Sequence, residues 1–297
     1  MLRLTNKIVD DKGRIAGYTF VTLENKEVDI KLSELPKYIN EVENGSINNG
    51  YLVIAGVKSI DIPLKRLKDK RIGKSKFVIT TNRYNMTVEQ NIFVAKRNIV
   101  DYIWKSAKLE GLTVTYPDTE AIYNGLIVYG VSVDDILAVN NLKRAWRFVL
   151  ETLDYPTDYP FICKINQYVG DSDLIYKAGF ICTMPVTIGG TTWRPDTPIE
   201  SQIKEDISRA QEIKNPTDKG ITIMLYLMRK QMFLDGNKRT SMLVGNHVMI
   251  SNGVGIISIP IELQYQFTTL LVKYYESTNM AEIKKFVYEK CIDGIKF

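Results

Sequence analysis

Two helical patterns joined by a short polar turn constrain the fold of this chain more than any other stretch. Ile221–Met228 is largely apolar, and Ser241–Ile250 shows a second helical pattern. Between them, Gln231–Thr240 contains the polar turn Asp235–Arg239. A run that is apolar on most sides is typical of a helix buried in a core. The sequence therefore predicts a buried helix, a sharp turn and a second helix.

The turn has the composition of an anion-binding site. Backbone N–H groups in the first turn of a helix have no intrahelical partner and lie at the positive end of the helix dipole. Gly236 permits the sharp turn, and Lys238 and Arg239 add positive charge that suits a phosphate. Asp235 is the one carboxylate in the loop and is suited to Mg²⁺ that bridges phosphate oxygens. A plain loop before a helix N-cap is the competing interpretation of so short a motif.

These residues resemble the signature of the Fic/Doc (Fido) family, His-x-Phe-x-Asp/Glu-Gly/Ala-Asn-Gly/Lys-Arg. The matching residues are Phe233, Asp235, Gly236, Asn237, Lys238 and Arg239. Most members transfer AMP from ATP to a hydroxyl side chain of a target protein, and the Doc branch transfers phosphate. The resemblance implies that Phe233 holds the loop in the core and that Asp235 binds Mg²⁺. It also implies that the Gly236–Arg239 backbone cradles phosphates, with Asn237 and Arg239 as side-chain ligands.

Three positions depart from the commonest form of that signature. The family's His, which takes the proton from the target hydroxyl, is Gln231 here, and a carboxamide cannot accept a proton near neutral pH. The second Gly is Lys238, as in the Doc branch, and the Arg that often follows is Met242. The only histidine, His247, lies ten residues beyond Asn237 on the same predicted helix, about 15 Å along its axis. We therefore expect His247 to be a packed or partly exposed helix residue.

A second motif lies at the end of an earlier helical pattern. Apolar residues at three- and four-residue spacings predict a helix over about 87–111, and Ser106 and Glu110 share one face of it, with Gly111 as its C-cap. These residues resemble the inhibitory helix of many Fic proteins, Ser/Thr-x-x-x-Glu-Gly/Asn. The resemblance implies that Glu110 projects into the nucleotide site and displaces the triphosphate. Because Met242 replaces the usual Arg partner, Glu110 is expected to pair with Arg239 or Lys238.

The segment Ile181–Pro195 predicts a β-hairpin, with the pair Gly189-Gly190 as its turn. In Fic proteins a flap hairpin at this position holds the target segment by strand pairing, which would involve Ile188, Gly189, Gly190 and Thr191. An exposed strand edge can bind a peptide through main-chain hydrogen bonds. A hairpin that only closes the domain is the alternative.

The composition is that of a globular chain: 297 residues, 45% hydrophobic and 25% charged, with a net charge of +5. Three cysteines without metal-like spacing and a single histidine argue against a Cys/His zinc site. The polar N-terminus is unlike a signal peptide, and no apolar run reaches the length of a membrane span. We therefore expect a cytoplasmic protein of bacterial type that does not act at a membrane.

The sequence divides into three parts. Residues 1–64 read as short strands broken by turn signals, with a short helix over Ser33–Val42, and predict a small β-rich accessory module. Residues 65–80 begin with a basic run that lacks interleaved aromatic residues, so we interpret them as a linker and not as a nucleic-acid surface. Residues 81–297 are expected to form the Fic-like domain.

The predicted fold is mainly α, a Fic-type helical core with a β-hairpin flap preceded by the β-rich module. The resemblance implies a protein adenylyltransferase that uses ATP and Mg²⁺, inhibited by Glu110 and impaired by Gln231. The alternatives are a non-catalytic protein that binds a nucleotide and a partner, or a Doc-like phosphate transferase. The expected partners are ATP or a related nucleotide and a target protein with a hydroxyl side chain, and a homo-oligomer is left open.

Overall fold

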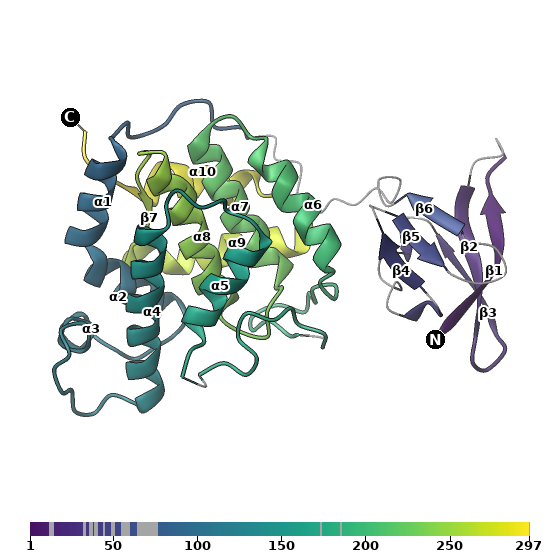
Figure 1. The fold of residues 1–297 in the computed structure, drawn as a ribbon, viewed down its shortest axis with the longest axis horizontal. Helices are drawn as coiled ribbons and strands as arrows, with labels where there is room; N and C mark the ends of the chain where they lie inside the picture. The colour runs from purple at the N-terminus through teal and green to yellow at the C-terminus, as the bar shows by residue number, and fades with distance from the viewer. Residues whose placement is uncertain are drawn as a thin grey trace. The chain divides into compact units, whose positions relative to one another are not determined.

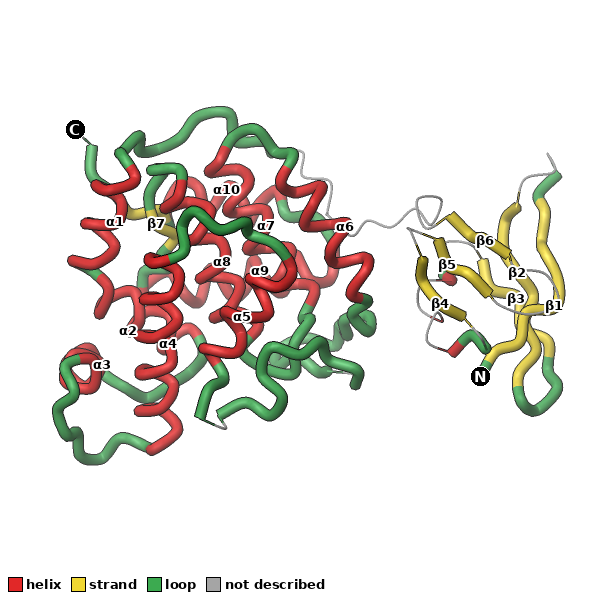
Figure 2. The backbone as a smooth tube through the Cα atoms, in the orientation of Figure 1, coloured by secondary structure: helices red, strands yellow, loops and turns green. Residues whose placement is uncertain are grey.

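The structure of the chain is a computed structural model. It describes residues 1–11, 15–31, 34–35, 38, 41–43, 45–48, 51–54, 60–63, 77–172, 174–184 and 186–296. The chain divides into two compact units, Met1–Arg71 and Ile72–Phe297 (Figure 1). The first contains six β-strands and the second is mainly helical (Figure 2).

The first unit contains two antiparallel three-stranded sheets. One has the order β1 (Leu2–Val9), β2 (Ile15–Thr22) and β3 (Glu27–Lys31), and the other has the order β4 (Gly45–Asn48), β5 (Tyr51–Ile54) and β6 (Ile60–Pro63). Tyr18, Phe20 and Ile30 are buried on the first sheet, where alternate residues face a common core. Five of the ten residues of the helix predicted over residues 33–42 lie outside the described residues.

The second unit is built from ten helices and one small sheet in the part of the chain that the structure describes. The helices are α1 (Val88–Arg97), α2 (Ile99–Leu109), α3 (Tyr116–Tyr123), α4 (Val133–Glu151), α5 (Tyr159–Val169), α6 (Glu200–Gln211), α7 (Pro216–Lys230), α8 (Asn237–Ser251), α9 (Gln264–Ser277) and α10 (Ala281–Lys290). A short 3-10 turn, Ile261–Leu263, precedes α9, and β7 (Ile256–Ile257) pairs with β8 (Ile292–Asp293). The expected mainly α fold is therefore confirmed.

Helix α7 is the centre of this unit, with α8 packed along it (Figure 1). Every residue of Ile221–Met228 is buried, which confirms the interpretation of that run as a core helix. Gly220 and Gly245 allow the two helices to approach closely, because a Cβ on either would lie 3.2 Å from the other's carbonyl oxygen. The first turn of α8 is thereby fixed on a rigid support.

The predicted helix over about 87–111 is two helices, α1 and α2, which meet at Asn98. Asn98 has φ −107° and ψ 13°, and its side chain donates to the Tyr102 hydroxyl at 3.3 Å. Asparagine side chains form local hydrogen bonds that compete with helix continuation, which accounts for the break. The expected linker also ends early, because Ile79 is buried and its N–H donates to Asp218 at 3.0 Å. Residues 64–76 lie outside the described residues.

The segment Ile181–Pro195 forms the predicted turn at Gly189-Gly190, but no strand occurs on either side of it in residues 181–184 and 186–195. The reason is that each arm bonds elsewhere in the domain. The Cys182 N–H donates to the Met232 carbonyl at 2.8 Å, and Thr191 donates to Glu276 on α9 at 2.7 Å. Trp193 stacks on Tyr275 of α9 at 5.4 Å. The segment is a loop attached to the core at both ends, and the predicted hairpin pairing is wrong here.

Candidate functional site

Side chains within the loop between α7 and α8 fix its conformation. Gln231 ends α7 in the left-handed conformation (φ 49°), and Gly236 begins α8 in the same region (φ 74°). Phe233 is buried in the main core cluster, as expected. The Asn237 amide accepts from the Phe233 N–H at 3.0 Å and donates to the Phe233 carbonyl at 2.7 Å. The side chain of Asn237 therefore fixes the shape of the loop.

Asn166 on α5, which the sequence did not indicate, also holds this loop. The Asn166 amide, on α5, donates to the Asp235 carbonyl at 3.1 Å and to the Thr240 hydroxyl at 3.0 Å. Its oxygen accepts from the Gly179 N–H at 2.7 Å. Asn166 is fully buried, so its three bonds join α5, the Gly179 turn and the signature loop. No local sequence signal distinguishes it from other polar residues on that helix.

The first turn of α8 is open to a ligand. No side chain caps the helix, and among the described residues the N–H groups of Asn237, Lys238 and Arg239 have no acceptor. These unpaired N–H groups carry the partial positive charge at the N-terminal end of the helix dipole. A Cβ at Gly236 would lie 2.9 Å from both Ile175 and Val169, so this position requires glycine for space as well as for its positive φ.

Glu110 reaches this helix start from the end of α2. The Leu112 N–H donates to the Ala107 carbonyl at 3.1 Å, and the Gly111 N–H donates to Lys108 at 3.0 Å, while Gly111 has φ 83°. This is the Schellman type of helix end, which glycine favours. The expectation that Gly111 ends the helix is confirmed, and the turn directs Glu110 toward α8.

The carboxylate of Glu110 pairs with the two cations of the signature. Its Oε2 lies 2.9 Å from Lys238 Nζ, and its Oε1 lies 3.9 Å from Arg239 Nε. The Arg239 side chain is only 7% exposed, and Arg239 Nη2 lies 3.5 Å from Asp235 Oδ2. Glu110 Oε1 and Arg239 Nε are buried without a hydrogen bond, so the second contact is a charge contact only. The expected pairing of Glu110 with Lys238 or Arg239 is confirmed.

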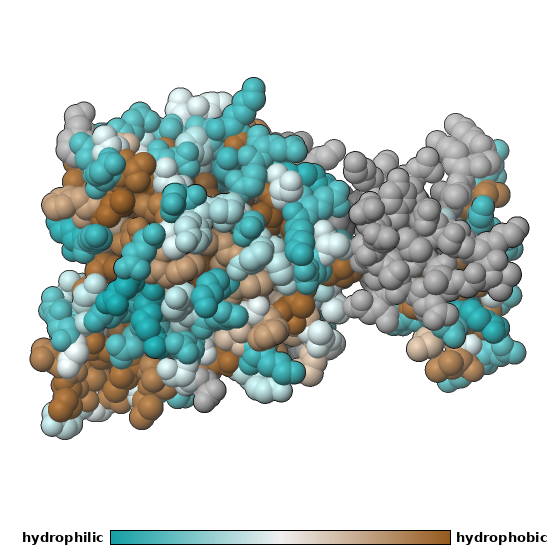
Figure 3. All heavy atoms as spheres, viewed as in Figure 1, coloured by the Kyte–Doolittle hydropathy of each residue, from teal (hydrophilic) through white to brown (hydrophobic). Residues whose placement is uncertain are grey.

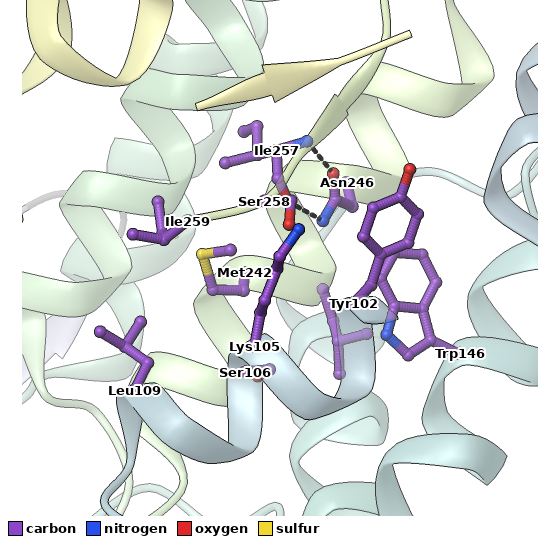
Figure 4. Close-up of a pocket in the computed structure, with 11 residues that line it drawn as sticks. Tyr102, Lys105, Ser106, Leu109, Trp146, Met242, Asn246, Ile257, Ser258 and Ile259 are labelled. Carbon is purple, nitrogen blue, oxygen red and sulfur yellow. Dashed lines mark hydrogen bonds between the residues drawn. The ribbon is translucent and has the colours of Figure 1, made fainter. Parts of the chain in front are cut away.

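Ser106 does not join this cluster. It lines a narrow cleft between α2 and α8 together with Leu109 and Met242 (Figure 4). In the same cleft the Asn246 amide bonds both the N–H and the carbonyl of Ile257, at 2.6 and 2.9 Å. The position where the family often has a second Arg is therefore apolar, and Met242 itself is 7% exposed.

Gln231, at the position of the family's base, is held by a hydrogen bond to the end of α7. Its Nε2 donates to the Met228 carbonyl at 2.6 Å, and its side chain lines the same pocket as Tyr275. Burial, and to a smaller extent the Glu110 carboxylate, raises the pKa of Tyr275 above its usual value of 10.0. The phenol therefore stays protonated near neutral pH. Neither side chain can take a proton from a target hydroxyl.

A pocket of about 290 Å³ opens beside these residues. Glu110, Gln231, Asp235 and Lys238 form its polar part. The apolar part comes from the loop before α6, the signature loop and α9, with Val186, Ile188, Leu234, Leu271, Val272 and Tyr275. Of the predicted flap residues, Ile188 and Gly189 line the pocket, whereas Thr191 bonds Glu276. The loop thus borders the pocket without pairing as a strand.

The single histidine lies away from this pocket. His247 is buried on α8, with Nδ1 2.8 Å from the Thr157 hydroxyl and Nε2 2.9 Å from the Thr152 carbonyl. Burial lowers the pKa of His247 below its usual value of 6.5. The expectation of a packed helix residue is confirmed, and both ring nitrogens are engaged in the core.

Asp235 is the acidic side chain with room for a cation. It is 65% exposed, and its Oδ1 accepts from the Gly236 N–H at 2.6 Å. Among the described residues, no group of three His, Cys, Asp or Glu is arranged to hold a metal. A single carboxylate fits Mg²⁺ that takes its remaining ligands from phosphates and water. In the described part of the chain, no helix is long and apolar enough to cross a membrane.

Comparison with known proteins gives the same family from sequence and from structure. The chain is 25% identical over 199 residues to protein adenylyltransferase fic-1 of Caenorhabditis elegans, covering 63% of this chain and 38% of that protein. The solved structure of residues 134–508 of that protein matches with a TM-score of 0.53 at 21% identity, over 66% of this chain and 61% of that one. A Fic domain-containing signaling protein of Bacteroides thetaiotaomicron matches with a TM-score of 0.56 at 19% identity, over 68% and 84%.

No family model matches the chain. The chain spans about two fifths of the length of the curated relatives it matches. The chain therefore has a Fic-type helical fold, and its sequence is similar to that of Fic-type protein adenylyltransferases.

Proposed function

We propose that the chain is a Fic-type protein adenylyltransferase that transfers AMP from ATP to a hydroxyl of a target protein. We also propose that Glu110 inhibits this activity by closing the site. The observation that carries this proposal is the Glu110 carboxylate bound to Lys238 and Arg239 at an uncapped helix start. A carboxylate there occupies the cations that a terminal phosphate would otherwise use.

The residues fit a nucleotide with Mg²⁺. The free N–H groups of Asn237–Arg239 and the side chains of Lys238 and Arg239 would hold phosphate oxygens, and Asp235 would hold the metal. Bound Mg²⁺ would neutralise charge on the phosphates. The Asn237 amide is used within the loop, so its part in binding would fall to its backbone N–H.

The target hydroxyl would approach from the pocket bordered by Ile188 and Gly189. In the reaction its oxygen forms a bond to the α-phosphorus of ATP, the bond to pyrophosphate breaks, and the hydroxyl proton must leave. Gln231 can accept a hydrogen bond but no proton, and Tyr275 stays protonated. General-base help is worth about 10²- to 10⁴-fold, so transfer should be slower by that order than with a histidine at position 231.

A non-catalytic nucleotide-binding function is the second candidate. It is favoured by Gln231 itself, because its amide donates to the Met228 carbonyl and cannot take a proton at the position of the base. In that case the chain would bind a nucleotide and change its affinity for a partner. Doc-like phosphate transfer, suggested by Lys238, needs the same missing base.

Labelling with ATP carrying ³²P at either the α or the γ position separates these functions. Glu110→Gln is incubated with cell lysate as acceptor, beside Glu110→Gln/Gln231→His and wild type. Label from the α position alone means AMP transfer, and label from the γ position alone means phosphate transfer. ATP binding without label in either variant would reject both transferase functions, and an absence of ATP binding would reject all three.

A further inference from the structure

The end of the helical unit that carries the Glu110 loop also carries an exposed apolar surface. Leu126, Ile127, Tyr129 and Val133 are 64%, 81%, 90% and 71% exposed. Figure 3 shows apolar atoms gathered over α3 and the loop that leads to α4. Five of the sixteen exposed large hydrophobic residues in the described part of the chain lie within residues 116–133. Contiguous patches of this kind mark interaction sites more often than scattered single residues do.

The backbone of this loop is also free. Among the described residues, the N–H groups of Ile127–Val131 have no acceptor, although Gly125 and Leu126 bond back to α3. Gly125–Val133 contains no charged residue. Apolar side chains and free main-chain donors can therefore meet a partner on the same short stretch.

The surroundings of the patch are acidic. Gly111–Leu142 contains four acidic residues and no Lys or Arg, in a chain that has 39 Lys and Arg in 297 residues. The next residue, Lys143, donates to the Tyr123 carbonyl at the end of α3, so the acidic residues outnumber the cations around the patch. Asp118 and Glu120 lie on α3, and Asp134 and Asp135 lie in the first turn of α4. Glu120 and Asp134 are exposed. A partner whose apolar side chains are flanked by basic residues complements this surface.

The charge argues against two other occupants. In a symmetric dimer the same patch would face itself, so the acidic residues of both copies would be brought together. An anionic membrane surface would be repelled by the same residues. The charge pattern thus favours a basic protein segment.

We propose that the loop Gly125–Val133, with the acidic residues of α3 and α4 around it, is a docking surface for a partner protein with a basic, amphipathic segment. The surface is tied to the inhibitory loop. Thr113, three residues beyond Glu110, donates from its N–H and its hydroxyl to Asp135 Oδ2, at 3.0 and 2.8 Å. A partner on the patch therefore acts on the segment that holds Glu110. Only this last consequence rests on the proposed function.

Binding can be tested with a fluorescent synthetic helical peptide of Leu and Lys and a charge-reversed peptide of Leu and Glu. The proteins are the full chain, the double variant Ile127→Ser/Tyr129→Ser, and Tyr265→Ser as a control for loss of a single exposed aromatic residue on α9. We expect the wild type and the control to bind the Leu/Lys peptide, more weakly as salt increases, and the double variant to bind at least tenfold more weakly. Equal binding by the double variant, or equal binding of the Leu/Glu peptide, would overturn the proposal.

Hydrogen exchange gives a readout that needs no nucleotide, so it separates failure of this surface from failure of the nucleotide site. The Ile127–Val131 amides should exchange fast in the free chain and slow down with the Leu/Lys peptide, and exchange at Thr113 should also change. Unchanged exchange at 127–131 would reject the surface, and unchanged exchange at Thr113 alone would reject its link to Glu110. Self-association in sedimentation velocity that is lost in the double variant would overturn the proposal and show that the patch binds a second copy of the chain. Binding to phosphatidylserine vesicles that is lost in the double variant would overturn it in favour of a membrane.

Discussion

Replacing Glu110 by Gln should strengthen the binding of ATP with Mg²⁺ about 30-fold. Glu110 Oε2 lies 2.9 Å from Lys238 Nζ, so a phosphate oxygen that takes the same cation must come close to the carboxylate. Two unit negative charges about 4–5 Å apart repel by about 3–4 kcal/mol at an effective dielectric constant near 20. Lys238 is one-third exposed, and solvent and salt reduce this to about 2 kcal/mol, or roughly 30-fold in Kd.

Calorimetric titration of ATP and Mg²⁺ measures this gain directly. Glu120→Gln is the matched control, because it removes the same charge from an exposed position on α3. In the double variant Glu110→Gln/Lys238→Met, most of the gain should disappear, since Lys238 is the cation that Glu110 releases. The expected gain of about 2 kcal/mol corresponds to roughly 30-fold in Kd. If the Kd of Glu110→Gln is within about threefold of the wild-type value, the reasoning is refuted. An equal gain in Glu120→Gln would show that net charge alone is responsible.

Three further predictions concern the base position, the turn and the histidine. In the Glu110→Gln background, Gln231→His should raise the rate of label transfer from α-³²P ATP by about 10²- to 10⁴-fold at a pH where the imidazole is neutral, whereas Gln231→Asn should not. Gly236→Ala should lower the free energy of unfolding in urea by about 2–4 kcal/mol, from the positive φ and the contacts of a Cβ with Ile175 and Val169. Gly189→Ala, where a Cβ meets nothing within 4 Å, should leave that free energy unchanged. Because burial lowers the folded-state pKa of His247, the unfolded chain binds more protons, so stability should fall as pH drops below about 6.5 and this slope should be absent in His247→Gln. The one imidazole signal in the NMR spectrum gives the pKa directly, and a value above 6.5 would contradict this prediction.

The local parts of the site could be predicted from the sequence because their causes are local. The buried run before the loop, the sharp turn at Gly236 and the helix end at Gly111 each follow from residue type and spacing over a few positions. The pairing of Glu110 with Lys238 could also be predicted, because Met242 stands where the usual Arg partner would be and Lys238 and Arg239 are the remaining cations of the signature.

The parts that failed depend on contacts between distant segments. Two glycines predict a turn at Gly189-Gly190, but whether its arms pair depends on competing partners such as the Met232 carbonyl and the Tyr275 ring. Ser106 shares a helix with Glu110 but faces a different cleft. Asn166, which holds the signature loop from α5, lies 69 residues before Asp235 and has no motif of its own.

The open start of α8 means that this helix is incomplete without a group from outside it. In the present structure Glu110 supplies a negative charge there, but no acceptor completes the first-turn N–H groups in the described part of the chain. An anion that binds these groups acts as the missing cap, so its binding free energy is added to the stability of the helix. Occupancy of the site should then appear as a rise in melting temperature with ligand concentration. A thermal-shift screen of nucleotides would therefore identify the natural ligand even in a chain that transfers nothing.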